Sequence, residues 1–268
     1  MQYTTLGSSG LKISRIALGC MSFGDTSRGF NEWALDDTAA EPLFRQAVEL
    51  GITFWDTANA YGYGTSEEIV GRAIRKYTRR DDVVLATKVF FKMHDGPGGS
   101  GLSRRAILEQ LDDSLRRLDI DYVDRLTAST PRPPSRRRSR RFPTQCARAR
   151  FATSVRPRCG HGSSRRCSTS RSFPAGRGRL DAEPAQPAAT RPQADADAVQ
   201  QVADKRGVSV AEVALAWVLN NPVVSAPIVG ATKQHHLADA VAALDITLTD
   251  DEIAQLEQHY TPREPTGY

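Results

Sequence analysis

The sequence lacks the features that would mark a membrane-bound, secreted or metal-binding protein. No uninterrupted apolar run reaches the roughly 18 residues of a membrane-spanning helix, and no basic-then-apolar leader begins the chain. Only four cysteines occur, and Cys146, Cys159 and Cys167 have spacings that match no usual zinc pattern. We therefore expect a cytoplasmic protein with no membrane segment, no metal site and no disulfide framework.

Lysine is absent from residues 125–193, a segment that holds 17 arginines and only two acidic residues, Asp181 and Glu183. The whole chain has a formal net charge of +5, whereas the other 199 residues contain 19 basic and 29 acidic side chains. The basic charge is therefore local. The Arg, Ser, Pro and Thr composition of this segment has no helical or strand period and cannot bury a core. We predict a single domain, 1–268, in which residues 125–193 form an aberrant, disordered segment.

Outside this segment, short apolar runs alternate with amphipathic helices, which is typical of a parallel sheet covered by helices on both faces. The expected elements are a hairpin over 3–14, strands at 16–18, 52–55, 83–86, from 122 and at 226–229, and a helix over 194–206. Further helices are expected to begin at a cap, Asp36 or Asp37, and at two capping boxes, Thr65 with Glu68 and Ser209 with Glu212. Others are expected to start near Ser103, His235 and Asp250.

Residues 56–62, Asp-Thr-Ala-Asn-Ala-Tyr-Gly, follow a predicted strand and resemble the signature of the aldo-keto reductases. Residues 19–21, 86–88 and 227–233 resemble the ends of the first, third and eighth barrel strands of that family. The resemblance covers 1–124 and 194–268. It implies an α/β fold, the (β/α)8 TIM barrel, which is incomplete here because the family pattern of strands four to seven is disrupted or missing.

The resemblance implies that Tyr61 donates a proton to a carbonyl oxygen while hydride arrives from a nicotinamide. A free phenol has a pKa of roughly 10, so this role needs a neighbour that stabilises the phenolate. Lys88 is expected to be that neighbour, and Asp56 to pair with Lys88. The family also has a catalytic histidine after its fourth strand, where this chain has Ser129. Taken singly, each of these side chains also has a purely structural explanation.

The resemblance further implies NADP(H) as cofactor, held where the first and eighth strands end. Glycine permits close approach of the backbone, and a helix N-terminus with a hydroxyl and an ammonium suits a 2′-phosphate. The alternative is an ordinary helix N-terminus with a surface lysine. The predicted cofactor-binding residues are Gly19, Met21, Gly230, Thr232, Lys233, His236 and Asp239.

The genetic code offers a test of the aberrant segment. When each codon is built from the third base of one residue and the first two bases of the next, residues 145–162 permit V-R-A-G-x-V-R-Y-L-G-A-S-S-M-W-A-W, which resembles the family's fifth strand and following helix. The same offset across 126–131 permits H-R-F-D-P, with the missing histidine, and a different offset across 179–184 permits V-S-M-Q-N, which is similar to the sixth strand. The segment is interpreted as out-of-frame translation.

Three functions stay open. The first is an NADPH-dependent reductase of small aldehydes or ketones, with no nucleic-acid partner expected. The second is an inactive, partly unfolded product of a frameshifted reductase gene, since a barrel with missing strands has open edges. The third is an Arg-rich nucleic-acid-binding module, centred on residues 136–141, attached to a dead reductase. The sequence indicates neither the particular carbonyl substrate nor the oligomeric state.

Overall fold

The computed structural model describes residues 1–28, 31–128 and 191–259, and side chains from Ala194 onward in the last range. Most of the segment predicted to be aberrant therefore lies outside the described residues. The same is true of the shifted runs at 145–162 and 179–184 and of Ser129.

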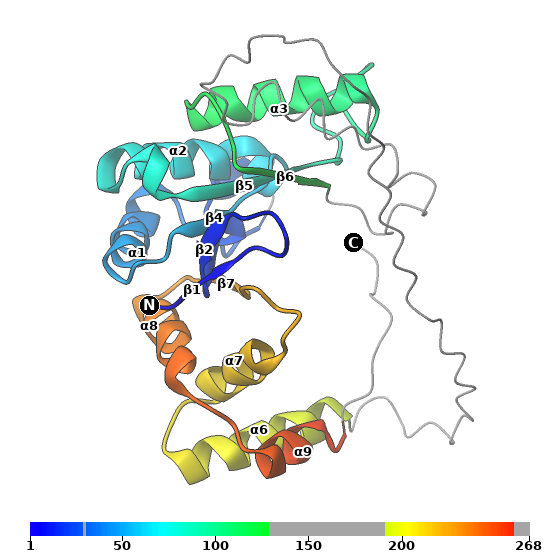
Figure 1. The fold of residues 1–268 in the computed structure, drawn as a ribbon. Coiled ribbons are helices and arrows are strands. Elements are labelled where there is room, and N and C mark those ends of the chain that lie inside the picture. Colours follow the sequence, from blue (N-terminus) through cyan, green and yellow to red (C-terminus); the bar gives the residue numbers. More distant parts are fainter. Residues whose placement is uncertain (29–30, 129–190, 260–268) are drawn as a thin grey trace, which may run out of the picture.

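The described part of the chain contains a sheet of five parallel strands in the order β6-β5-β4-β3-β7 (Figure 1). Their bounds are β3 Ala17–Gly19, β4 Phe54–Asp56, β5 Val84–Val89, β6 Arg125–Ala128 and β7 Ile228–Gly230. Among the strands of this sheet, the last along the chain, β7, thus pairs with the first, β3, and Gly19 lies opposite Gly230. This arrangement confirms the predicted α/β fold, and a last strand beside the first is what barrel closure requires.

An antiparallel hairpin, β1 (Tyr3–Thr5) and β2 (Lys12–Ser14), precedes the sheet as predicted. Ser14 is fully buried, and its hydroxyl donates to the carbonyl of Ile16 and accepts from the backbone N–H groups of Thr53 and Phe54. The hairpin therefore closes the end of the sheet at which the strands begin, opposite the end that carries the predicted site.

Helices α1 (Asp37–Glu49), α2 (Thr65–Tyr77), α3 (Arg104–Leu118) and α8 (Gln234–Ala242) cover the outer face of the sheet. The largest buried side chains between them are Trp55, Phe23 and Phe44, and the rings of Phe44 and Trp55 lie 5.2 Å apart. A second apolar cluster joins α6 (Arg191–Arg206), α7 (Val210–Asn220) and α9 (Asp250–Glu257), around Val202 and Val213. In Figure 1, α6 and α9 lie side by side at the end of the molecule away from α3.

The predicted caps at Asp36, one of two alternatives, and at Ser209 are confirmed, because each side chain accepts from the backbone N–H three residues on. Ser103, near which a helix is predicted to start, is also an N-cap. The predicted capping box of Thr65 with Glu68 is wrong. The N-cap of α2 is Gly64, in a left-handed conformation, and Thr65 is the first helical residue. The Thr65 hydroxyl donates instead to the carbonyl of Gly62 and so stabilises the loop before the helix.

The predicted bounds of the aberrant segment, 125–193, are wrong at both ends, and the strand expected from residue 122 begins instead at Arg125. Residues Arg125–Ala128 form β6, in parallel register with β5, because ladder hydrogen bonds come from the backbone and need no apolar alternation. At the other end α6 begins at Arg191 instead of residue 194, and the proline at 192 is compatible with a first helical turn.

No helix within the described ranges is long and apolar enough to cross a membrane. The cytoplasmic location stays a prediction.

Candidate functional site

The predicted catalytic residues meet at the carboxyl ends of β4 and β5. Asp56 is the last residue of β4 and lies opposite Ala86, so Lys88, two residues further along β5, is on the same face of the sheet. Tyr61 begins the short helix η3 (Tyr61–Gly64) that follows β4. Active sites of parallel α/β barrels form at this end of the strands.

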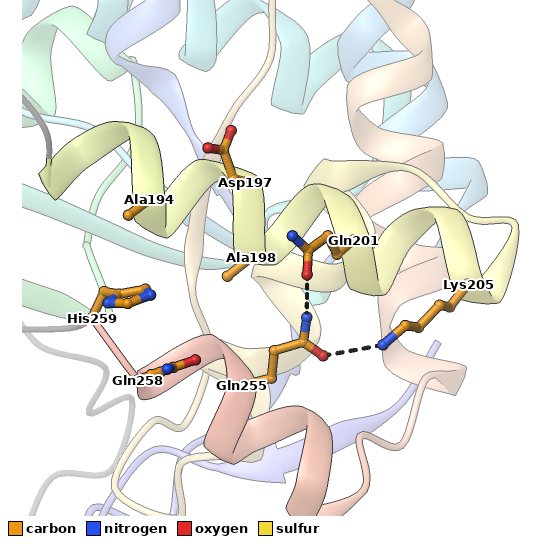
Figure 2. A pocket seen from close by; sticks show the side chains of 8 residues that line it. All are labelled: Ala194, Asp197, Ala198, Gln201, Lys205, Gln255, Gln258 and His259. Carbon is orange, nitrogen blue, oxygen red and sulfur yellow. Dashed lines mark hydrogen bonds between the residues drawn. The ribbon is translucent and has the colours of Figure 1, made fainter.

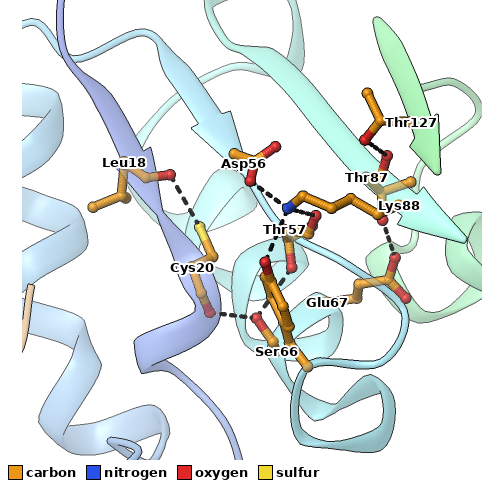
Figure 3. Close-up of polar contacts among 10 residues, drawn as sticks. Leu18, Cys20, Asp56, Thr57, Ser66, Glu67, Thr87, Lys88 and Thr127 are labelled. Atoms are coloured by element: carbon orange, nitrogen blue, oxygen red, sulfur yellow. Dashed lines mark hydrogen bonds and ion pairs between the residues drawn. The ribbon is translucent and has the colours of Figure 1, made fainter. Parts of the chain in front are cut away.

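The Lys88 ammonium is hydrogen-bonded to both Asp56 and Tyr61, and Figure 3 shows how it lies against Asp56 and Thr57. Its nitrogen donates to the Asp56 carboxylate at short range, to the carbonyl of Thr57 at 3.0 Å and to the Tyr61 hydroxyl at 3.0 Å. An ammonium has three protons, and these three acceptors match that number. Because Tyr61 accepts from Lys88, its hydroxyl keeps its own proton to donate.

Burial and neighbouring charge shift the pKa of Lys88 in opposite directions. Only 18% of the Lys88 side chain and 8% of the Asp56 side chain are exposed. Burial, the largest single influence, disfavours the ammonium, but Asp56 and Tyr61 outweigh it and raise the pKa of Lys88 above its ordinary value. The ammonium therefore stays charged at neutral pH, and a fixed positive charge beside a phenol oxygen favours its phenolate form.

A strained turn presents Tyr61. Gly62, Tyr63 and Gly64 all have positive φ values, of 55°, 50° and 97°. A Cβ at Gly62 would lie 2.3 Å from the Thr65 hydroxyl oxygen, so this position needs glycine. The Thr65 hydroxyl also accepts from the backbone N–H of Asp25, and it thereby joins the loop after β3 to the Tyr61 turn.

Ser66, in the first turn of α2, holds the ends of two strands together. Its hydroxyl donates to the carbonyl of Cys20 at 2.7 Å, so the Thr57 hydroxyl, 3.1 Å away, is the donor in their contact. Cys20 itself is fully buried, and burial, reinforced by the Asp56 carboxylate, raises the pKa of its thiol. The thiol is therefore neutral and serves as packing behind Asp56.

A buried ion pair lies directly behind Lys88, on the outer face of the sheet. Glu67 is fully buried, and its carboxylate accepts from the Thr87 hydroxyl at 2.6 Å and from the Arg117 guanidinium at 2.7 Å. This ion pair is not among the groups predicted from the sequence, although the sequence contains a signal for it. Glu67 shares the apolar face of α2 with Val70 and Ile74 at helical spacing, and a charge on such a face needs a buried partner.

The fourth strand supplies no histidine among the described residues. Thr127 lies opposite Lys88 in the pairing of β5 with β6, and its hydroxyl donates to the carbonyl of Thr87 at 3.4 Å. It is the side chain on β6 closest in register to the site. The structure thus brings together three predicted catalytic residues, Asp56, Tyr61 and Lys88.

The predicted cofactor residues lie at the ends of the neighbouring strands β3 and β7 and in the segments that follow them, η1 and the start of α8. Gly19 and Gly230 face each other, and a Cβ on Gly19 would lie 3.0 Å from a methyl carbon of Ile228. A Cβ on Gly230 would lie 3.3 Å from the Ser22 hydroxyl oxygen. Because neither glycine has a side chain, no Cβ atom projects from the backbone at this edge of the site. Met21, in the helical turn η1 (Cys20–Ser22) after β3, has 40% of its surface exposed.

The start of α8 has the donors that an anionic group requires. No side chain caps its first turn at Lys233, whose ammonium is exposed, and Thr232 precedes it. His236 is half-buried and turns back, so that its Nδ1 accepts from the Thr232 backbone N–H at 3.3 Å. Asp239, one turn further on, is half-buried. A helix N-terminus with a hydroxyl and an ammonium fits the phosphate of a dinucleotide.

No group of three or more His, Cys, Asp or Glu side chains able to hold a metal ion occurs within residues 1–28, 31–128 and 191–259. A pocket between α6 and α9 is lined by polar side chains, including Asp197, Gln201 and Lys205 (Figure 2). Gln255 fills part of it by hydrogen bonds to Gln201 and Lys205. None of the predicted site residues lines this pocket.

Comparison with known proteins agrees with this geometry. The sequence profile described as "Aldo/keto reductase family" matches residues 15–143 and 164–261. The chain belongs to the aldo/keto reductase family. The match extends beyond 1–124 and 194–268, the ranges that carry the sequence resemblance, and leaves 144–163 unmatched.

Several relatives of this aldo/keto reductase are similar over most of the chain. It is 32% identical to versiconal hemiacetal acetate reductase of Aspergillus parasiticus, over 98% of each protein. It is 30% identical to the uncharacterized oxidoreductase YrpG of Bacillus subtilis, over 96% of this chain and 94% of YrpG. Aldo-keto reductase YhdN of Bacillus subtilis is 40% identical, but over only 50% of this chain and 39% of YhdN.

The first of these alignments spans 343 positions, whereas the aldo/keto reductase described here has 268 residues, so at least 75 positions (343 − 268) have no counterpart in it. Membership nevertheless fixes the fold and the reaction class. The fold is a (β/α)8 barrel, of which the five parallel strands described above are part. The family consists of oxidoreductases that use a nicotinamide cofactor on small carbonyl compounds.

Replacing Glu67 should test whether the buried pair supports the site. We expect Glu67→Gln to lower the free energy of unfolding by about 2–4 kcal/mol, because Arg117 loses its counter-charge. The loss is below the full cost of breaking a buried pair, since 20% of the Arg117 side chain is exposed. Urea titration measures it. Glu68→Gln, one position along α2, is the matched control and should change stability by less than about 0.5 kcal/mol. Equal effects of the two substitutions would contradict this role.

Proposed function

We propose that the chain reduces aldehydes or ketones to alcohols with NADPH as the hydride source. The observation that carries this proposal is the Lys88 ammonium, which donates both to the Tyr61 hydroxyl and to the Asp56 carboxylate. A phenol fixed next to an ammonium suits one task above others, the donation of a proton to an oxygen that becomes negative during the reaction.

Tyr61, Lys88 and Asp56 have different roles in the proposed reaction. A bound nicotinamide would provide a hydride for the carbonyl carbon, so that negative charge develops on the carbonyl oxygen. Tyr61 gives its proton to that oxygen, so that an alcohol is formed and the charge moves to the phenolate. Lys88 stabilises the phenolate through the existing 3.0 Å hydrogen bond, and Asp56 holds the ammonium in place. The charged groups are fixed before the reaction begins, which lowers the cost of reorganisation.

The choice of NADPH over NADH is part of the proposal. Thr232 and the exposed ammonium of Lys233, at the uncapped start of α8, suit the extra 2′-phosphate of NADPH. Gly19, Met21 and Gly230 would lie along the cofactor between this phosphate and the catalytic residues. His236 and Asp239 are proposed to contact the adenosine part, and the existing bond from His236 to the Thr232 backbone would fix the ring.

Tyr61→Phe should separate catalysis from binding. We expect kcat for a simple aldehyde such as 4-nitrobenzaldehyde to fall by about 100-fold or more, because the proton donor is lost. The Kd for NADPH, measured by fluorescence quenching, should change little. Tyr63→Phe is the matched control, since Tyr63 lies two residues away with 51% of its surface exposed. A folded wild-type protein that binds NADPH but reduces no carbonyl in a broad panel would overturn the proposed activity.

Lys233→Met should show which cofactor the chain prefers. We expect the Kd for NADPH to rise about tenfold, equivalent to 1.4 kcal/mol, with little change in the Kd for NADH. The difference should shrink as salt is added, because an exposed ion pair is screened. Lys12→Met, on β2 at the opposite end of the sheet, is the control and should leave both affinities unchanged. A parallel loss of affinity for both cofactors would show that Lys233 does not read the 2′-phosphate.

We also propose that residues 125–193 contain out-of-frame translation. The shifted codons of 145–162 support it, as do the unmatched residues 144–163 and the missing alignment positions. Sequencing the gene anew across codons 124–194 tests it. We expect insertions or deletions that restore the fifth-strand motif and the histidine after the fourth strand. An unchanged sequence in which both flanking frames are correct would leave the segment a genuine part of the protein.

A further inference from the structure

Gln110 is a buried polar residue that the catalytic scheme does not use. It lies in the middle of α3 with only 1% of its surface exposed, on the side of the helix that faces the strand ends. Burying an amide is costly unless its oxygen and nitrogen are hydrogen-bonded. Methionine would fill a similar volume without that cost, so packing alone does not account for an amide at this position.

Three segments meet at the Gln110 amide. The Asn59 side-chain nitrogen donates to its oxygen at 2.7 Å, and the Phe90 backbone N–H donates to the same oxygen at 3.4 Å. The Gln110 nitrogen donates to the carbonyl of Gly98 at 3.3 Å. With donors on one side and an acceptor on the other, only one orientation of the amide satisfies all three contacts.

Two of these segments carry the catalytic groups. Asn59 lies between Asp56 and Tyr61, is itself 1% exposed, and donates its backbone N–H to the carbonyl of Lys88 at 3.1 Å. Phe90 follows Lys88 by two residues and has a φ of 145°, a value that residues with a side chain seldom adopt. The hydrogen bond from Phe90 to Gln110 therefore holds the backbone in an unfavourable conformation next to the site.

The third segment is the loop over residues 91–101. It is closed on itself by bonds from the Met93 N–H to the Gly99 carbonyl, 2.9 Å, and from the Gly101 N–H to the Phe90 carbonyl, 2.7 Å. Gly98 lies directly against α3, since a Cβ there would be 2.1 Å from a carboxylate oxygen of Glu109. Gln110 thus fixes a compact loop to the same point that fixes the catalytic strand ends.

We propose that Gln110 is a positioning residue, whose single amide holds the Tyr61-bearing segment, the end of β5 and the loop over 91–101 as one unit. The inference rests on the proposed reductase function for its effect on catalysis. Its effect on the structure does not depend on activity, so the two can be tested apart.

The kinetic test compares Gln110→Met with Gln46→Met, a matched substitution in α1 away from the site. We expect Gln110→Met to lower kcat for 4-nitrobenzaldehyde by about 10- to 100-fold, because displacing a reacting group by about 1 Å costs that much. The Kd for NADPH should stay within about twofold, since the cofactor residues lie on β3, β7 and α8, and a tenfold change would already require 1.4 kcal/mol. Gln46→Met should match the wild type in both.

A double-mutant cycle identifies the contact responsible. Asn59→Ala removes the other partner of the 2.7 Å bond, so the Asn59→Ala/Gln110→Met protein should lose little more kcat than the worse single variant. Losses that multiply, or a fall in kcat accompanied by an equal loss of NADPH affinity, would overturn the positioning role and indicate general damage to the fold.

Amide hydrogen exchange gives the arm that needs no activity. In Gln110→Met, peptides covering residues 57–63 and 90–101 should exchange at least about tenfold faster, because local opening becomes easier by about 1.4 kcal/mol, while α1 keeps its wild-type rate. Faster exchange confined to α3, or no change in the two segments, would refute the inference. A wild-type protein without turnover would refute the proposed function alone, since the exchange result still decides the role of Gln110.

Discussion

The site depends on one ammonium group with three acceptors. Lys88, from β5, joins the Asp56 carboxylate, the Thr57 carbonyl and the Tyr61 hydroxyl, which all belong to the continuous run 56–61 at the end of β4 and just beyond it. Removing any acceptor leaves a proton of a largely buried cation unsatisfied, which is expensive in the interior. The strand ends, the strained turn at Gly62 and the first turn of α2 therefore have to be placed together.

The first turn of α2 shows how this placement is achieved. Three consecutive residues, Thr65, Ser66 and Glu67, point to three different partners, namely the loop after β3, the ends of β3 and β4, and the strand residue behind Lys88. None of these side chains takes part in the proposed reaction. Polar groups buried in this way fix geometry more than they add stability, because their desolvation offsets much of what their hydrogen bonds contribute.

Much of this arrangement was accessible from the sequence, because strand period, helix caps and the run at 56–62 are local signals. These signals located four of the five strands of the sheet. They also predicted that Asp56, Tyr61 and Lys88 lie at one end of it. They failed where the chain departs from local rules. Strand β6 has no apolar alternation, yet its backbone pairs with β5, and Gln110 was not recognisable because its partners, Asn59, Phe90 and Gly98, are brought to it only by the tertiary fold.

Because β7 pairs with β3, the two parts of the proposed site differ in how far apart their residues lie in the sequence, and therefore in how they form during folding. The proton-transfer group comes from one continuous stretch, residues 56–88, whose contacts are short in sequence and form at low entropic cost. The proposed phosphate site, at the start of α8, is placed beside these residues only when β7, more than two hundred positions after β3, is added to the sheet edge, which requires closing a very long loop. The cofactor end of the proposed site therefore depends on a single long closure, whereas the group of Asp56, Tyr61 and Lys88 depends on the pairing of neighbouring strands.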